Sequence, residues 1–568
     1  NVDLGSRLSL KNSVIWGNRS IFVNSMDEPL PKVSEAIHHT KGTKGAELTT
    51  IEHCLIEHSG GSAHWNPALG VDLGGNLDTD PHFSAPFSSP SAPWRVSTGG
   101  NYRLSENSPA IDAGTVTPPM DSADLDGDGD VDEPLPFDLG GNDRILGRGM
   151  DLGAYEYAYE CWFVDAKATG DGTGLSWRDA FTSLQDALDD SEPPDSRAAA
   201  SREIWVAQGV YYPDEGVDRS DNDPEATFRL RDGDAIYGGF TGEETTREAR
   251  DSVKNVTILS GDIDQNDKNE DGNLIAEDTT QIDGRNSYHV VASGGKRSAV
   301  LDGFTITGGL ANSPGHIDGA GLYVASGSLI ISDCVFSGNK ANNVGGALLL
   351  SSQVDTPLVI GCRFVGNGAR LGGAIFTAFD GGFVTQSILA GNRAESDGGA
   401  VYVQGQTTFT NSVISGNYSE TKAGGVFSDE HVVHFDSCTL WGNRAGELAG
   451  DVRAGPFVSF NNCIVGLDST LSLKATYRHC LVEGSGGSVA WNPDYGVDGG
   501  GNLDGDPGFL MTIVPEEAPT VSGDLRLTPK SPLVDKGAIG LLPKDIGDVD
   551  GDGDTEELLP LDLEGNAR

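Results

Sequence analysis

Two short acidic stretches have the residue types and spacing of calcium loops. Asp124–Pro134 reads DLDGDGDVDEP and Asp548–Leu558 reads DVDGDGDTEEL. Acids on alternate residues, separated by small glycines, can fold several carboxylate oxygens around one Ca²⁺. An EF-hand loop also needs a closing acid at its twelfth position. Leu135 and Leu559 stand there, so we predict self-contained calcium turns, with an acidic solvated turn as the alternative.

The predicted calcium ligands are the acids of these two stretches. They are Asp124, Asp126, Asp128, Asp130 and Asp132 in the first stretch, and Asp548, Asp550, Asp552, Asp554 and Glu556 in the second. A weaker third candidate is DIDQNDKNEDG, which begins at Asp262 and includes Asp264. Calcium is preferred over magnesium because many flexible carboxylates suit its larger, less regular coordination shell.

The overall charge favours cations as partners. The chain of 568 residues has 38 Lys and Arg against 85 Asp and Glu, for a net charge of −47. Such a surface repels nucleic acid, because phosphate binding requires basic patches. No apolar run is long enough for a spanning helix. We therefore predict no nucleic-acid partner and no membrane span.

A long repeat relates two distant parts of the chain. Cys54–Phe83 (CLIEHSGGSAHWNPALGVDLGGNLDTDPHF) matches Cys480–Phe509 (CLVEGSGGSVAWNPDYGVDGGGNLDGDPGF), and Leu135–Arg144 matches Leu559–Arg568. We predict that residues 1–158 are the last part of a first unit and 159–568 a second, nearly complete unit. We also expect a longer, tandemly repeated polypeptide, or self-association of copies end to end.

A short repeat of about 25 residues lies within the second unit. The segments DCVFSGN, GCRFVGN, QSILAGN, NSVISGN and SCTLWGN recur from Asp333 to Asn443, with GGA or GGV segments between them. Short alternating apolar runs between glycine and asparagine turns predict strands with one buried face. A fixed period of this length predicts the coils of a β-solenoid, in which each rung buries its inner face on the next.

One register position of the short repeat is filled mostly by cysteine. Its members are Cys334, Cys362, Ser387, Ser412, Cys438 and Cys463, with Cys54 and Cys480 in later rungs. The position could hold metal or disulfides between rungs. Because serine alternates with cysteine, we favour a stack of small buried side chains.

The asparagine that ends each repeat forms a second series. Asn339, Asn367, Asn392, Asn417 and Asn443 are predicted to stack as a turn ladder. Asparagine tolerates left-handed backbone conformations, and stacked amides can bond to one another along the axis.

The second unit divides into three predicted regions. A cap and early rungs fill 159–300, regular rungs fill 301–480, and a C-terminal calcium-loop region fills 481–568. SWRDAFTSLQDALDD (Ser176–Asp190) predicts an amphipathic helix with Phe181, Leu184, Ala187 and Leu188 on one stripe. Such a helix could cover the first coil, because an open solenoid end exposes sheet edges.

Several segments together resemble a known group of proteins. WRDAFTSLQDAL, EIWVAQGVYYP, AIYGGFTGEE, ILSGDID and LDGFTITGG are similar to secreted bacterial right-handed parallel β-helix proteins. The GGA and SGN repeats resemble polymorphic outer-membrane proteins, and SPAIDAG…DLDGDGD…DLGAYEY resembles the choice-of-anchor Q ending. The resemblance implies an all-β, right-handed parallel β-helix at the cell surface or outside the cell. It implies little about activity.

Three functions remain open from the sequence. The preferred one is a non-catalytic, calcium-stabilised structural unit of a surface protein, fibre or sheath. The second is an adhesin that binds carbohydrate or cells through exposed loops and aromatics such as Trp65 and Trp491. The third is a polysaccharide lyase, which would need acids and a basic residue converging in a cleft. Calcium is the expected cofactor, and a polysaccharide is a possible partner.

Overall fold

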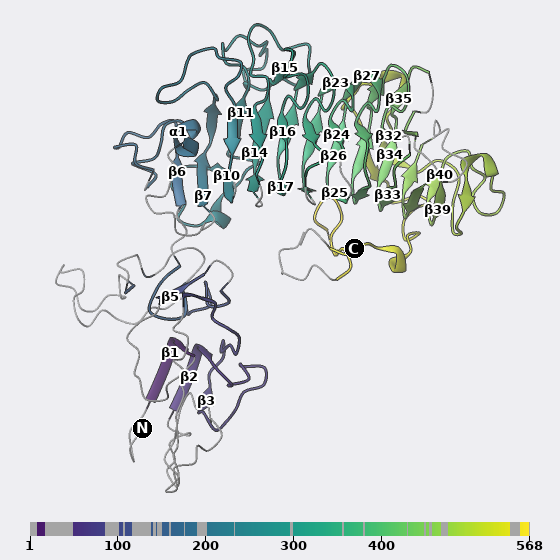
Figure 1. The fold of residues 1–568 in the computed structure, drawn as a ribbon. Coiled ribbons are helices and arrows are strands. Elements are labelled where there is room, and N and C mark those ends of the chain that lie inside the picture. The colour runs from purple at the N-terminus through teal and green to yellow at the C-terminus, as the bar shows by residue number, and fades with distance from the viewer. Residues whose placement is uncertain are drawn as a thin grey trace. The chain divides into compact units, whose positions relative to one another are not determined.

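The structure is a computed structural model and comprises two compact units (Figure 1). One unit contains residues 1–160 and 245–248, and the other 161–244 and 249–568. The structure describes residues 8–16, 49–85, 101–105, 108–115, 138–139, 144, 150–157, 161–174, 176–189, 202–231, 233–295, 299–354, 357–378, 381–428, 430–447, 450–453, 457–466, 475–545 and 557–566. We call the two units the first and second unit.

The second unit is a right-handed parallel β-helix, as the repeats and the resemblance predicted. Central rungs contribute one strand to each of three long parallel sheets, of 12, 10 and 8 strands, and several of them add a strand to a fourth sheet of 6 strands. The first sheet contains β6 (Cys161–Val164), β7 (Arg202–Ala207), β10 (Asp234–Phe240), β13 (Ala299–Asp302), β17 (Leu329–Ser332), β21 (Leu358–Ile360), β25 (Gly382–Thr385), β29 (Thr407–Thr410), β33 (Val433–Asp436), β37 (Val458–Asn461), β39 (Thr476–Arg478) and β41 (Val497–Asp498).

The other three long or short sheets of the solenoid are also built from parallel strands of successive rungs. The second sheet contains β8 (Gly209–Tyr211), β11 (Thr257–Ser260), β14 (Phe304–Thr307), β18 (Val335–Ser337), β22 (Arg363–Val365), β26 (Ile388–Ala390), β30 (Val413–Ser415), β34 (Thr439–Trp441), β38 (Ile464–Val465) and β40 (Leu481–Val482). The third contains β9 (Phe228–Leu230), β12 (Val291–Ser293), β16 (Leu322–Val324), β20 (Leu348–Leu350), β24 (Ile375–Thr377), β28 (Val401–Val403), β32 (Val426–Ser428) and β36 (Val452–Arg453). The short sheet contains β15 (Leu310–Ala311), β19 (Lys340–Ala341), β23 (Gly368–Leu371), β27 (Arg393–Asp397), β31 (Tyr418–Ser419) and β35 (Arg444–Ala445).

The remaining elements lie outside these stacks. The first unit has a parallel sheet of β1 (Leu8–Ile15), β2 (Thr49–Ile56) and β3 (Val71–Asp72), and an antiparallel pair, β4 (Phe83–Ala85) and β5 (Asn101–Leu104). The second unit ends with an antiparallel pair, β42 (Phe509–Met511) and β43 (Asp524–Leu527). The helices are α1 (Leu184–Asp189) and the short 3-10 turns η2 (Arg247–Ala249), η3 (Pro493–Tyr495), η4 (Pro515–Glu517) and η5 (Ile539–Leu541).

The capping helix is shorter than the sequence predicted. It covers six residues, because the Ser183 side chain accepts hydrogen bonds from the Gln185 and Asp186 backbone N–H groups at 3.1 and 3.4 Å and starts the helix there. Leu184, Ala187 and Leu188 are buried and join the main core of the second unit. The predicted apolar stripe is therefore correct, although the preceding residues from Ser176 are not helical.

Aromatic rings stack through the core along the axis. Phe409, Phe435, Phe460 and Tyr477 occupy successive rungs of the first sheet, with ring centroids 5.2, 4.8 and 4.9 Å apart. Trp491 follows Tyr477 at 5.5 Å and donates its indole N–H to the Gly496 carbonyl at 3.0 Å. Trp491 is thus half-buried against the aromatic stack. Its use by an adhesin stays a prediction.

Trp65 has the equivalent place in the first unit. It is half-buried, packs on the cluster of Ile51, Cys54, Ile56 and Leu69, and donates to the Gly70 carbonyl at 2.9 Å. The sequence repeat around Cys54 and Cys480 therefore builds the same local structure twice. We call Cys54–Phe83 and Cys480–Phe509 the end modules.

Candidate functional site

The cysteine register is a buried hydrogen-bonded column. Its members in the second unit are at most 2 % exposed: Cys334, Cys362, Ser387, Ser412, Cys438, Cys463 and Cys480. The backbone N–H of one rung donates to the side chain of the next, as from Cys362 to Ser387 at 3.2 Å and from Cys438 to the Cys463 sulfur at 3.4 Å. The cysteines are free thiols in the structure. Burial raises the pKa of the Cys463 thiol, so the column provides packing and weak hydrogen bonds.

The asparagines form a continuous ladder inside the solenoid. From Asn367 onward, each Oδ1 accepts from both the backbone N–H and the Nδ2 of the preceding asparagine, at 2.8–3.0 Å. The Oδ1 of Asn339, the first member, accepts from the Gly309 N–H at 3.0 Å. Each Nδ2 also donates to a strand carbonyl; that of Asn392 reaches Phe364 at 2.9 Å. The ladder ends where Asn443 donates to Asp451 at 2.7 Å. Every amide of the ladder is therefore paired without water.

The predicted backbone conformation of these asparagines is wrong. The left-handed residue is the glycine before each one, with φ of 59–69° at Gly338, Gly366, Gly391, Gly416 and Gly442. Glycine takes this conformation without strain, so the chain turns inward and the next side chain points into the core. The asparagines are at most 1 % exposed and are interior residues of the turn.

Most predicted calcium ligands lie outside the described residues. This applies to Asp124, Asp126, Asp128, Asp130, Asp132, Asp548, Asp550, Asp552, Asp554 and Glu556. Within the described part of the chain, no three His, Cys, Asp or Glu side chains are grouped so that they could hold a metal ion. The described candidate is the loop of Asp262 and Asp264, which follows β11.

The loop after β11 gathers half-buried carboxylates. Asp262 accepts from the Asn266 and Asp267 N–H groups at 3.0 and 3.1 Å, and Asp264 accepts from the Arg285 N–H at 2.9 Å. Burial raises the pKa of Asp262, and the charge of Asp264 raises it further. Burial also raises the pKa of Asp267 to about 7. The loop thus holds more negative charge than its own hydrogen bonds neutralise.

Two oxygens of this loop could accept a cation. The Oδ1 atoms of Asp264 and Asn286 are buried and have no hydrogen-bond partner. Asn286 donates its Nδ2 to Asp267 at 2.9 Å and to the Gly308 carbonyl at 2.7 Å, which orients the amide. Oxygens from acids, amides and backbone carbonyls are the ligands that Ca²⁺ prefers. The loop offers too few carboxylates to surround a cation. A bound cation would also need amide, carbonyl or water oxygens as ligands.

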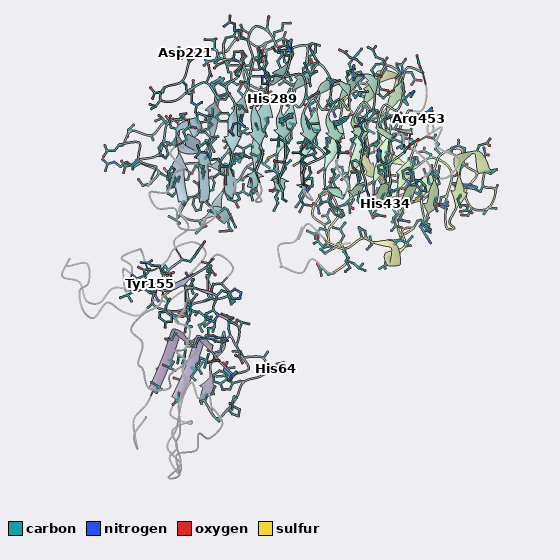
Figure 2. All side chains as sticks on the ribbon, in the orientation of Figure 1. His64, Tyr155, Asp221, His289, His434 and Arg453 are labelled. Carbon is teal, nitrogen blue, oxygen red and sulfur yellow. The ribbon has the colours of Figure 1, made fainter. Side chains whose placement is uncertain are left out.

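A second acidic loop lies close to the first. It follows β8, the strand that pairs with β11, and contains Asp214, whose Oδ1 is also buried without a partner. Burial raises the pKa of Tyr212 to about 12, with the charges of Asp262, Glu215 and Asp214 adding to the shift. Figure 2 shows Asp221 of this loop away from the sheets. The early rungs therefore present two adjacent acidic loops on one side.

A histidine pair is a site that sequence reasoning missed. His289, labelled in Figure 2, places its Nε2 3.2 Å from the Nδ1 of His316, and its own Nδ1 lies 3.0 Å from the Gly319 carbonyl. Because that carbonyl only accepts, His289 carries its proton on Nδ1 and His316 must donate to Nε2. Burial lowers the pKa of His289. The pair could not be recognised in the sequence, because the two residues are 27 apart and meet only across neighbouring rungs.

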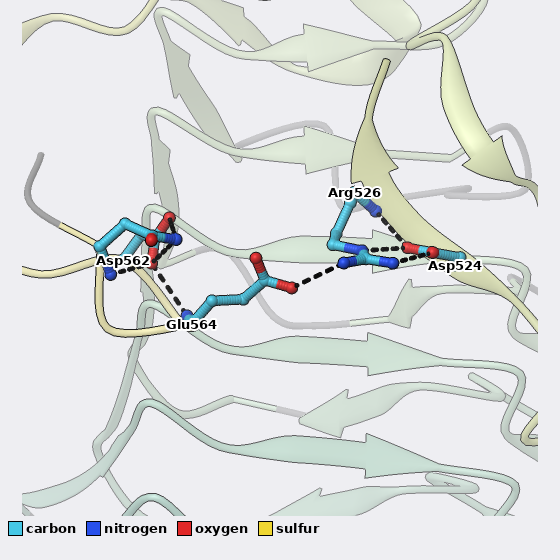
Figure 3. A network of polar contacts seen from close by, with 5 residues as sticks. Asp524, Arg526, Asp562 and Glu564 are labelled. Carbon is cyan, nitrogen blue, oxygen red and sulfur yellow. Dashed lines mark hydrogen bonds and ion pairs between the residues drawn. The ribbon is translucent and has the colours of Figure 1, made fainter. Parts of the chain in front are cut away.

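A groove of about 1140 Å³ runs along the outer face of the second sheet. Its floor includes Arg363, Ile388 and Val413, and its wall is formed by β43 and the segment of Asp562 and Glu564. Arg526 in this wall bonds to Asp524 at 2.5 Å and to Glu564 at 3.4 Å (Figure 3). These hydrogen bonds raise the pKa of Arg526 and lower that of Asp524. The positive charge of Arg526 is therefore balanced by the carboxylates of Asp524 and Glu564.

Comparisons with known proteins support the fold. A family model described as "Right handed beta helix region" matches residues 288–464. No curated protein matches the chain. Among solved structures, the "Crystal structure of pectate lyase Pel9A" is similar with 10 % sequence identity and a TM-score of 0.35, covering 66 % of this chain and 90 % of that chain. A likeness this distant carries no argument about activity.

No described helix of the chain is long and apolar enough to cross a membrane.

Proposed function

We propose that the chain is a non-catalytic structural unit of an extracellular surface protein, fibre or sheath, stabilised by calcium. The observation that carries the proposal is the end module, which occurs once in each unit with the same internal contacts. Asn76 and Asn502 accept from the N–H of Cys54 and Cys480 at 2.8 and 2.9 Å, and Trp65 and Trp491 close both modules in the same way. A repeated module that finishes a solenoid suits a polymer of units joined covalently or by self-association.

Interior order supports a load-bearing role. The asparagine ladder and the aromatic stack pair successive rungs through the core, so stiffness is distributed along the axis. None of these described interior contacts involves a ligand. Calcium is proposed at the Asp262 loop and at the two acidic stretches that begin at Asp124 and Asp548, where it would neutralise crowded carboxylates.

The test is thermal unfolding of the full chain in calcium and in chelator. We expect chelator to lower the melting temperature, and Asp264→Asn to remove part of that difference. Asp271→Asn is the matched control, because Asp271 is exposed on the same loop and bonds to neighbouring Asn273. Equal melting of the unaltered chain in both conditions would reject calcium stabilisation.

The groove supports a second candidate, binding of an acidic polysaccharide. It is large enough for several sugar rings, and Arg363 is exposed on its floor. Cleavage would need a basic group that is free to take a proton, whereas Arg526 is engaged by two carboxylates. Arg363→Ala should abolish retention on an immobilised acidic polysaccharide if this candidate is correct, and release of unsaturated ends would identify a lyase.

A further inference from the structure

The His289–His316 pair joins two neighbouring rungs outside the solenoid core. His289 lies just before β12, and His316 lies in the segment between β15 and β16. β12 and β16 pair directly in the third sheet. Both histidines are half-buried, so protons from the solvent reach the pair while packing holds part of each ring. The pair is therefore a contact between rungs that can respond to pH.

Three polar groups fix where the protons of this pair lie. The Gly319 carbonyl accepts from the Nδ1 of His289 at 3.0 Å, so the Nε2 of His289 is left as an acceptor. The Nδ1 of His316 lies 3.2 Å from that Nε2 and donates to it. The neutral pair thus has one donor facing one acceptor, and a change in its number of protons changes the contact.

His316 is carried by a tight turn. The backbones of Ser313 and His316 exchange two hydrogen bonds, at 3.1 and 2.8 Å. Gly315, between them, has φ of 95°, which is the left-handed conformation required at the third position of a type II turn. The ring of His316 also stacks on that of Tyr288, with centroids 5.0 Å apart. The turn therefore holds this imidazole in place beside the other histidine.

The Ser313–Gly319 segment lies on the outer face of the third sheet. A Cβ at Gly319 would lie 2.8 Å from the Leu349 Cβ and 3.2 Å from the Tyr323 ring, so the backbone is close to both side chains. Tyr323 is the half-buried middle residue of β16, and its ring centroid lies 5.0 Å from that of His289. Asn343, from the next rung, donates its Nδ2 to Asp318 at 2.7 Å. The segment thus covers outward-facing side chains of two strands.

The charged groups that face His289 act in both directions. Burial lowers the pKa of His289, and the charges of His316 and of Arg229 in β9 lower it further. The hydrogen bond to the Gly319 carbonyl and the Asp318 carboxylate oppose this shift. Since the pKa is lowered on balance, the folded chain favours the neutral form of His289.

We propose that the His289–His316 pair is an acid-sensitive latch that holds the Ser313–Gly319 segment against the third sheet. One added proton leaves the latch closed, because a protonated His289 can donate to the Nδ1 of His316 once His316 carries its own proton on Nε2. A second proton places two N–H donors face to face on two positive rings, so the contact is lost. The two protons are taken up in separate steps, because the first charge disfavours the second.

The response to acid should be local. Because the folded chain lowers the pKa of His289, the contribution of this residue to stability is present above about pH 6.5, the ordinary pKa of histidine, and is lost as the pH falls. The asparagine ladder of the core pairs through neutral amides, which do not titrate in this range. The segment is therefore released while the rungs beneath it stay folded. This inference goes beyond the proposed function and does not depend on calcium.

Hydrogen exchange of the full chain at about pH 7.5 and about pH 5 tests the latch, because histidine changes its charge between these values. Protection factors corrected for the intrinsic effect of pH should fall at least about tenfold at the lower pH for the hydrogen-bonded amides of Ser313, His316 and Gly319. Protection of β24 and β28, two strands of the same sheet, should not change.

Two variants identify the pair as the cause. His316→Asn keeps an amide that can donate to or accept from His289 but does not titrate, so the pH response of the segment should disappear. His434→Asn is the matched control, because the Nδ1 of His434 contacts the Ser459 hydroxyl at 2.7 Å, a group that can accept as well as donate. It should leave the response of the segment unchanged. Equal protection of the unaltered chain at both pH values, an undiminished response in His316→Asn, or a loss that extends to β24 and β28 would each overturn the proposal.

Discussion

The two end modules repeat the same framework in the two units. Leu104 and Ala110 are buried beside Leu152 in the first unit, and the matching positions of the second unit hold Leu527 and Leu533. Asn12 and Asn462 each accept from a backbone N–H at 2.8 Å. The shared contacts show that the repeat in the sequence is also a repeat in local structure.

The largest effect is expected from removing the Leu152 side chain of the first unit. Leu152→Ala should lower the free energy of unfolding of the first unit by about 2–4 kcal/mol, because it leaves a cavity among buried leucines. Amide exchange at Gly114 and Leu152 would report the loss. Leu139→Ala is the control, since Leu139 is 71 % exposed, and an equal cost for both variants would contradict the burial of Leu152.

A ladder variant tests whether the comparison is confined to the ends. Asn392→Ala should destabilise the second unit by about 2–3 kcal/mol, because the Asn367 N–H and amide lose their acceptor in a dry interior. Denaturant unfolding measures this cost. A cost below about 0.5 kcal/mol would contradict a fully paired, dry ladder.

The pair Asn12→Ala and Asn462→Ala compares the modules directly. The two variants remove the acceptors of the Thr115 and Ala538 N–H groups. We expect each to cost about 1–3 kcal/mol, because each leaves a backbone N–H without its acceptor. A cost in only one of the two units, measured by chemical denaturation, would contradict a shared framework.

The first unit should carry a pH dependence of stability through Asp151 and Glu156. Burial raises the pKa of Glu156 to about 8 from an ordinary 4.5, and that of Asp151 to about 6. Between about pH 4.5 and pH 8 the folded state therefore binds more protons than the unfolded state, in which Glu156 has its ordinary pKa. The contribution is complete below about pH 4.5 and is lost as the pH rises towards 8, at no more than about 1.4 kcal/mol per pH unit for one group.

Glu156→Gln provides the control for this dependence. It should flatten the pH profile of first-unit stability between pH 5 and 8 without changing that of the second unit. An unchanged profile in the variant would mean that Glu156 does not titrate in that range.

The repeats made the solenoid predictable, whereas the sites required the third dimension. The period of the GN and GGA segments predicted the rungs, and the cysteine register predicted a column of inward side chains. Both predictions follow from the local alternation of apolar and polar residues. The conformation of Asn392 was mispredicted, because its inward position depends on the left-handed glycine before it. The packing of Trp491 on Tyr477 was not predicted, because the sequence does not show which side chains meet across rungs.

The candidate sites were predicted less completely. Asp262 and Asp264 were identified from spacing, but the part played by Asn286 came from a residue 22 positions beyond Asp264 that returns to the loop. His289 and His316 meet only because neighbouring rungs stack.

Thermal unfolding of the full chain in calcium and in chelator tests the central proposal most directly. Chelator should lower the melting temperature of the unaltered chain, and by less in Asp264→Asn. Equal melting of the unaltered chain in calcium and in chelator would contradict the account.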